Sequence, residues 1–159
     1  MNTETRREVA RHLHEKVVAY WHDVDFNWGR NASAHYTEDG IFLGSSVRYD
    51  GRSEIQEFYN WRIDRGERTN VHLVGNFHVE FEGDDTATAA WICTLYAKDG
   101  PPPQETAPPI SITRVVDTFV RQDNGDWLCA KRHWHGLFKG GVPATSLTRE
   151  EMANRMGKS

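Results

Sequence analysis

The beginning of the chain shows the spacing of an amphipathic helix. Residues 4–24 carry Val9, Leu13 and Val17 four residues apart, with charged residues between them. Because this spacing puts apolar side chains on one face of a helix, it predicts a helix that packs against a core. We expect the helix to end around Asp25, the last residue of a short polar run.

Shorter elements are expected next. Residues 28–37 are consistent with a second helix, and residues 38–40 (Glu-Asp-Gly) predict a turn before the apolar strand at residues 41–43. Ser53 and Gln56 then stand three residues apart, as a capping box requires, which predicts the start of another helix.

From residue 69 onward the pattern changes to strands. Phe77, Val79 and Phe81 alternate with His78 and Glu80, which is typical of a strand with one buried face. A proline-rich segment at residues 99–109 is expected to form a stiff hairpin loop or a lid, and a polar helix is expected at 149–156. The long strands are expected at residues 70–81, 86–97, 110–121 and 127–138.

Helices followed by consecutive long strands indicate an α+β fold. We expect one domain over residues 1–159, with the helices packed on one face of a curved antiparallel sheet and a C-terminal tail from residue 140. If the helices do not fill the concave face of the sheet, a pocket results.

Composition narrows the classes of function. Lys and Arg number 19 against 23 Asp and Glu, and no basic run stands out, so nucleic acid is a poor candidate partner. No apolar run is long enough to span a bilayer. Cys93 and Cys129 lie in apolar runs without motif spacing, which is typical of reduced core thiols in a cytoplasmic protein. Six tryptophans in a chain of mean hydropathy −0.70 indicate an interior, or a cavity, lined with rings.

Three phrases resemble a known superfamily. They are HYTEDGIF at residues 35–42, GRSEIQEFY at 51–59 and NGDWL at 124–128. They are similar to the SnoaL-like, or nuclear-transport-factor-like, superfamily, which includes scytalone dehydratase, bile-acid dehydratase, ketosteroid isomerase and a dehydrochlorinase. The resemblance covers roughly residues 5–140. It implies a cone-shaped α+β barrel with a deep apolar cavity, usually without a cofactor, and assembly into a homodimer or homotrimer.

The resemblance also implies an Asp–His dyad. The acid that follows the first helix corresponds to Asp25, and the histidine that opens the long strand corresponds to His72. Tyr20 falls where related enzymes have a pocket tyrosine. Two positions depart from the family, because a second polar dehydratase residue falls near Leu95 and the isomerase's catalytic aspartate falls near Gly44. Isomerase chemistry of that type is therefore disfavoured.

The dyad has a physical rationale as a device for removing protons. A carboxylate bonded to one ring nitrogen of His72 fixes the tautomer and leaves the other nitrogen as a base. Tyr20 would donate a hydrogen bond to a developing oxyanion. The structural alternatives are that Asp25 caps the second helix, that His72 is a core histidine and that Tyr20 is an ordinary buried aromatic.

The last strand offers further candidates. Strand alternation puts Arg132 and Trp134 on one face. The resemblance implies that Arg132 binds a leaving group or an anionic substituent. The alternative is that Arg132 is a solvated surface arginine. His133 and His135 share the other face and could ligate zinc together with the dyad, but the family is usually free of metal and we expect none. The other candidates for the cavity wall are Phe58, Tyr59 and Trp91.

These observations favour a cofactor-independent lyase or dehydratase that acts on a small, largely apolar cyclic or aromatic compound. Two alternatives stay open. One is a polyketide-type cyclase that uses the same base. The other is a non-catalytic module that binds a hydrophobic ligand or assembles into a larger oligomer, as small subunits of oxygenases do.

Overall fold

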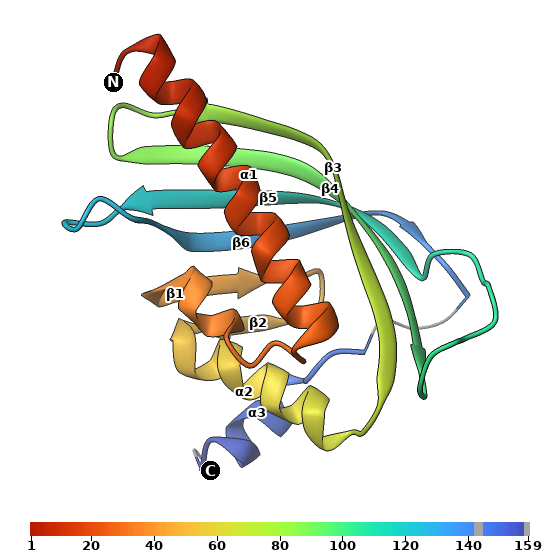
Figure 1. Cartoon of the computed structure of the whole chain (residues 1–159). Helices are drawn as coiled ribbons and strands as arrows, with labels where there is room; N and C mark the ends of the chain where they lie inside the picture. The colour runs from red at the N-terminus through yellow and green to blue at the C-terminus, as the bar shows by residue number, and fades with distance from the viewer. Residues whose placement is uncertain (142–144, 158–159) are drawn as a thin grey trace.

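The computed structural model describes residues 1–141 and 145–157, and residues 142–144 and 158–159 of the predicted tail lie outside this part. The described part folds into three α-helices, a single 3-10 turn and a six-stranded sheet (Figure 1). The helical elements are α1 (Thr3–Phe26), η1 (Ala32–His35), α2 (Gly51–Asp64) and α3 (Arg149–Arg155). The strands are β1 (Tyr36–Leu43), β2 (Arg48–Asp50), β3 (Arg68–Phe81), β4 (Thr86–Asp99), β5 (Ser111–Arg121) and β6 (Trp127–Lys139).

The sheet has the strand order β2-β1-β6-β5-β4-β3. All neighbouring strands are antiparallel except β1 and β6, which are parallel. The sheet curves around α1 and stays open, with β2 and β3 at its edges (Figure 1). The predicted α+β fold, with a curved sheet wrapped around helices as in a cone-shaped barrel, is therefore confirmed, and the sheet is mixed rather than wholly antiparallel.

The predicted face of α1 is the one that packs on the sheet. Leu13, Val17, Tyr20 and Trp21 are the buried residues of this helix, and their spacing places them along one stripe. Asp25 lies one turn beyond Trp21, so the same stripe carries its carboxylate towards the sheet. The periodicity that forms the helix thus also positions a polar group at the end of its buried face.

A bulge bends the long strand β3. Its pairing with β4 shifts register between Gly75 and His78, and Asn76 takes a φ of 49°. Because a bulge increases the local twist, the two halves of β3 run in different directions (Figure 1). The half that contains His72 therefore wraps around the end of α1.

The turn expected at residues 38–40 is wrong, because these residues lie within β1. The register of β1 against β6 shifts between Tyr36 and Ile41, so the polar residues form an irregularity inside the strand. Gly40 is required there, because an added Cβ would lie 2.8 Å from Cβ of Tyr36 and 3.1 Å from the carbonyl oxygen of Cys129.

Two expectations about helices are also wrong. Residues 28–35 contain only the single turn η1, and residues 36–37 begin β1. Trp28 and Gly29 take φ values of 62° and 70°, which no α-helix accommodates. The predicted capping box is absent at Ser53, since α2 begins two residues earlier with Asp50 as its N-cap. The amide of Asp50 donates instead to the carboxylate of Glu54 at 2.9 Å.

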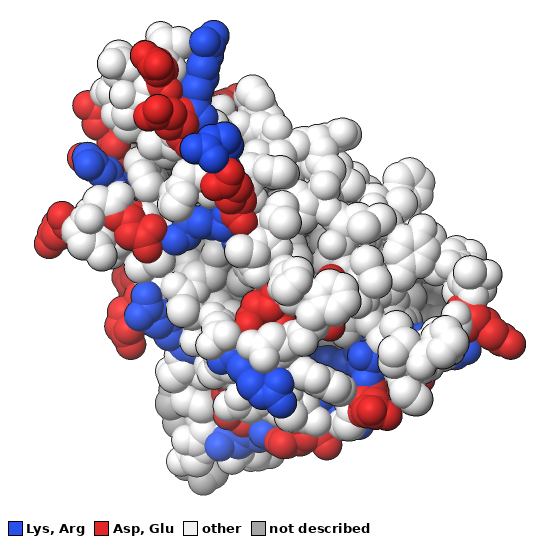
Figure 2. All heavy atoms as spheres, viewed as in Figure 1, with Lys and Arg blue, Asp and Glu red and all other residues white. Residues whose placement is uncertain are grey.

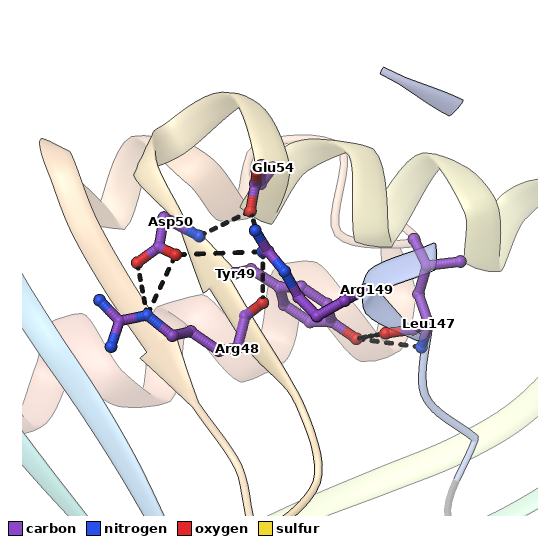
Figure 3. Close-up of polar contacts among 6 residues, drawn as sticks. All are labelled: Arg48, Tyr49, Asp50, Glu54, Leu147 and Arg149. Carbon is purple, nitrogen blue, oxygen red and sulfur yellow. Dashed lines mark hydrogen bonds and ion pairs between the residues drawn. The ribbon is translucent and has the colours of Figure 1, made fainter. Parts of the chain in front are cut away.

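The C-terminal segment is docked onto α2 and β2 rather than free. The hydroxyl of Tyr49 donates to the carbonyl of Leu147 at 2.9 Å and accepts from its amide at 3.0 Å (Figure 3). Arg149 donates to the carboxylate of Glu54 at 2.6 Å and to the carbonyl of Arg48 at 2.8 Å (Figure 3). These bonds hold the segment before α3 against the helical end of the molecule.

Both cysteines are free and buried, as expected of core thiols. Burial raises the pKa of Cys93 to about 12, so this thiol stays protonated near neutral pH. No helix in the part of the chain described here is long and apolar enough to cross a membrane.

Candidate functional site

A cavity of about 890 Å³ lies between the concave face of the sheet, the end of α1, α2 and the C-terminal segment. This volume is within the range of small-molecule sites. Aromatic rings form much of the wall, and three of the predicted wall residues, Phe58, Tyr59 and Trp134, lie in it. The cavity thus lies on the concave face of the sheet and is lined with aromatic rings. Other rings in the wall are those of Trp21, Trp28, Phe42 and Tyr49.

His72 lies in this wall, and Asp25 bonds to it from behind the wall. Nδ1 of His72 lies 2.6 Å from Oδ1 of Asp25, and His72 is one of the residues that line the cavity. Because a carboxylate accepts the Nδ1 proton, the neutral ring carries its free lone pair on Nε2. The side chains are only 11% and 5% exposed for His72 and Asp25, so the pair is shielded from bulk water.

Two further hydrogen bonds fix the Asp25 carboxylate. The backbone amide of His72 donates to Oδ2 at 2.8 Å, and Nδ2 of Asn70 donates to Oδ1 at 2.5 Å. A carboxylate held by three donors cannot rotate freely, so it holds the imidazole in one orientation. Asn70 lies two residues before His72, on the same face of β3.

The ring of Trp21 stacks on His72. The ring centroids are 3.9 Å apart, with an angle of 16° between the planes. Burial lowers the pKa of His72 below its ordinary value, and the hydrogen bond and charge of Asp25 oppose that shift. His72 is therefore neutral near pH 7, which is the state a general base needs.

Tyr20 lies behind the wall, and Tyr59 lies in it. The two hydroxyl groups are hydrogen-bonded, and the hydroxyl of Tyr36 lies 3.4 Å from that of Tyr20. Tyr20 is not among the described residues that line the cavity, whereas Tyr59 is. Burial raises the pKa of both Tyr20 and Tyr59, so both phenols stay protonated as donors. Of the two tyrosines, Tyr59 is therefore the one in the cavity wall, and its hydroxyl is bonded to that of Tyr20.

Arg132, which we expected to contact a ligand, is completely buried on the inner face of β6. Its Nε and Nη2 donate to the two oxygens of Asp117 at 2.8 and 2.7 Å. The guanidinium lies 4.5 Å from the ring centroid of Tyr20. Although burial disfavours the charged form, Asp117 keeps the pKa of Arg132 well above its ordinary value. The structure thus gives Arg132 a bidentate ion pair in the core.

The core around this ion pair holds the last predicted wall residue, Trp91. Its Nε1 donates to Asp117 at 3.0 Å, and it is not among the described residues that line the cavity. Possible ligand atoms of His35, Asp117 and Cys129 lie within 4.8 Å of one another. Both oxygens of Asp117 are already bonded to the guanidinium of Arg132, whose positive charge opposes a cation there. Nη2 of Arg132 also lies 3.3 Å from Nε2 of His35, so the guanidinium occupies the position beside two of the three residues and disfavours a cation there.

His133 and His135 do not join the dyad. Their rings lie 4.0 Å apart, and strand alternation puts them on the face of β6 opposite to Arg132 and Trp134. Since His72 lies in the cavity wall on the concave face, the three-ligand site considered from the sequence is not assembled.

Several residues of the site were missed in the sequence. Asn70 could have been found, because strand alternation places it beside His72. Trp21 could also have been found, since it lies one helical turn before Asp25. Asp117 gave a weaker signal as a charged residue between Val115 and Phe119 on an apolar strand face.

Solved structures with the same fold differ widely in sequence. A candidate scytalone dehydratase from Novosphingobium aromaticivorans aligns with 92% of this chain and 96% of its own, at 17% identity and a TM-score of 0.78. ActVI-ORFA from Streptomyces coelicolor aligns with 79% of this chain and 97% of its own, at 20% identity and a TM-score of 0.62. A protein from Catenulispora acidiphila, solved in complex with S-DNPA, aligns with 80% of this chain and 94% of its own, at 17% identity and a TM-score of 0.63.

No curated protein matches the chain significantly. The SnoaL-like domain matches residues 2–133, which include the dyad, the cavity-lining part of β3 and most of the sheet. This match confirms the resemblance drawn from the three sequence phrases. The chain therefore belongs to the SnoaL-like domain family.

Proposed function

We propose that the protein is a cofactor-independent lyase of the dehydratase type. Its substrate is a small, largely apolar ring compound with a hydrogen made acidic by a neighbouring carbonyl or aromatic system. The observation that carries the proposal is the 2.6 Å contact between His72 and Asp25 in the wall of an aromatic cavity. A shielded, neutral imidazole oriented by a carboxylate is suited to removing a proton from carbon.

The reaction would follow from the positions of three side chains. Nε2 of His72 takes the proton from carbon, and the electron pair of the broken C–H bond forms a double bond as the neighbouring C–O bond breaks. The hydroxyl group leaves as water when His72 passes the proton to it, so the enzyme returns to its starting state. Tyr59 donates a hydrogen bond to the oxygen on which negative charge develops. Asp25 stabilises the transient imidazolium.

Cyclisation of a polyketide-type chain is the second candidate. The cavity volume of about 890 Å³ is near the upper end of the range for small-molecule sites and leaves room for more than one ring. The same base would remove the proton, and a carbonyl carbon of the same molecule would accept the carbanion. Product analysis by mass spectrometry separates the two candidates, because elimination releases water without forming a new carbon–carbon bond.

Replacing Asp25 with Asn is expected to change both the rate and its pH dependence. The amide introduced at position 25 favours the wrong tautomer of His72, so kcat/KM on the plateau should fall about 10²- to 10⁴-fold. Because activity needs neutral His72, the rate rises with pH through the pKa of this group. Asp25 raises that pKa, so its removal should move the acid limb to lower pH. A pH profile of kcat/KM measures both effects.

Asp23→Asn is the matched control for this prediction. The carboxylate of Asp23 accepts hydrogen bonds from Asn27 and Asn31 and is not part of the dyad. This variant should keep the plateau and the acid limb of the wild type. If Asp25→Asn behaved like the control, the ligand-binding or assembly role would replace catalysis as the better account.

We also propose that the protein forms a homodimer or homotrimer through the outer face of β3 and β4. Figure 2 shows a broad area without charged side chains on the face that includes β3. Val71, Leu73 and Tyr96 are 39%, 52% and 40% exposed, and Val71 pairs with Tyr96 across the two strands. Light scattering coupled to size-exclusion chromatography should give two or three times the chain mass of 18.3 kDa. A monomer at micromolar concentration would contradict this assembly.

A further inference from the structure

The cavity wall carries positive charge without negative charge. Among the described residues that line it, the charged side chains other than His72 are Arg62, Arg68 and Lys139, and none is an Asp or Glu. The chain as a whole has a net charge of −4, so the excess of positive charge is a local property of the cavity wall. A largely apolar cavity whose charged side chains are all cations favours an anionic ligand.

Arg62 is the half-buried cation of the wall without an ion pair among the described residues, whereas Lys139, which also has none there, is exposed to solvent. Arg68 donates to the carboxylate of Asp99 at 2.7 Å, which neutralises it. Arg62 forms no ion pair with any described carboxylate, and its Nη1 is buried without a hydrogen-bond partner in the described part of the chain. Burial, followed by the charge of Arg68, lowers the pKa of Arg62 to about 10, so the group still carries its charge near pH 7. A buried guanidinium N–H without a hydrogen-bond partner is costly unless a ligand supplies one.

Other buried donors in the same wall also lack partners among the residues that the structure describes. They are Nε1 of Trp21, Nε1 of Trp134 and the hydroxyl of Thr113. Indole N–H groups can only donate, so a matching ligand offers oxygen acceptors rather than donors. Trp21 stacks on His72, which places one of these donors next to the base.

We propose that the cavity binds a ring compound that carries a carboxylate, with Arg62 as the carboxylate-binding residue. This inference rests on the proposed function, since it names the class of substrate for the same site. The planar guanidinium fork matches the two oxygens of a carboxylate. One half-buried positive charge without an ion pair suits a singly charged carboxylate better than a dianionic phosphate. The carboxylate serves as a binding handle, and His72 acts on another part of the molecule.

The test compares a charged ligand with its uncharged isostere. Naphthoate and naphthamide have the same rings and nearly the same shape, and their binding is measured by isothermal titration calorimetry. We expect the wild-type protein to bind naphthoate about 10- to 100-fold more tightly than naphthamide, the range given by a hydrogen bond to a charged group. In Arg62→Gln this preference should fall to about 3-fold or less, because the remaining donors are neutral, already paired or, in Lys139, exposed to solvent.

Arg65→Gln is the matched control, since it removes the same charge from the same end of α2. The guanidinium of Arg65 lies 5.0 Å from the ring centroid of Trp61 and is not among the described residues in the cavity wall. This variant should keep the preference for naphthoate. Arg62→Lys, which keeps the charge but loses the planar guanidinium, should give an intermediate preference for naphthoate. It is the variant to measure if Arg62→Gln does not fold.

The inference fails if the wild-type protein binds the two ligands equally or binds neither, or if Arg62→Gln keeps the full preference. Its failure is distinguishable from failure of the proposed reaction. Asp25→Asn should keep the preference for naphthoate, because the dyad is not needed for binding. A preserved preference in a protein without turnover would therefore support the carboxylate subsite and reject only the chemistry.

Discussion

Replacing His72 with Gln is expected to lower turnover about 10²- to 10⁴-fold, the contribution typical of a general base, while ligand binding changes little. Gln keeps a polar side chain that can still donate to Asp25, but it has no basic nitrogen with which to take a proton from carbon. The effect should therefore fall on kcat rather than on KM. Steady-state kinetics on a cyclic β-hydroxy ketone, chosen by screening with the wild-type protein, measures the change.

His14→Gln is the control for this experiment. His14 is an exposed histidine of α1 whose ring contacts Phe77 at a centroid distance of 4.9 Å, and it does not line the cavity. Its replacement should leave kcat and KM unchanged. A His72→Gln protein that is folded and retains wild-type kcat would show that another group removes the proton.

Replacing Asp117 with Asn is expected to destabilise the fold by about 3–5 kcal/mol, because it leaves the guanidinium of Arg132 buried without a counter-charge. Both side chains are completely buried, and Asp117 accepts bonds from Arg132 and from Trp91. Asn is similar in size, so the loss reflects charge more than packing. Urea unfolding followed by circular dichroism gives the difference in free energy of unfolding.

An exposed ion pair provides the comparison for this loss. Asp85 lies 3.7 Å from Arg121, and both side chains are largely in water, so Asp85→Asn should cost about 1 kcal/mol or less. Similar losses in Asp117→Asn and Asp85→Asn would show that the buried pair contributes no more than a surface pair. The role of Arg132 as a structural residue would then need to be revised.

Local pattern was sufficient to predict the parts of the fold that depend on neighbouring residues. The apolar stripe predicted the helix α1, and the polar run that ends at Asp25 predicted where it stops, because both signals depend on neighbouring residues. The long strands were predicted to within about two residues for the same kind of reason. The errors at residues 28–40 arose where positive φ values and a strand irregularity depend on contacts with distant residues such as Tyr59 and Cys129. The helix start expected at Ser53 was also wrong, since α2 begins at Gly51.

The ion pair of Arg132 could not be predicted in the same way. Asp117 lies opposite Arg132 across β5 and β6, but a register shift between Thr118 and Phe119 intervenes between this pair and the hairpin turn. Counting outward from the turn therefore gives the wrong partner. Arg62 posed a similar difficulty, because its position one turn after Phe58 shows that it lies near the apolar stripe of α2 without showing whether its charge finds a partner.

The measurement that tests the central claim most directly is hydrogen–deuterium exchange at carbon. α-Tetralone has acidic hydrogens next to its carbonyl group, and proton NMR in D₂O follows their loss at a concentration where the ketone is shown to be bound by quenching of tryptophan fluorescence. The account predicts that the wild-type protein accelerates this exchange above the rate in buffer and that His72→Gln returns it to the rate in buffer. Exchange of bound ketone at the same rate with both proteins, whether fast or at the rate in buffer, would contradict proton removal by His72.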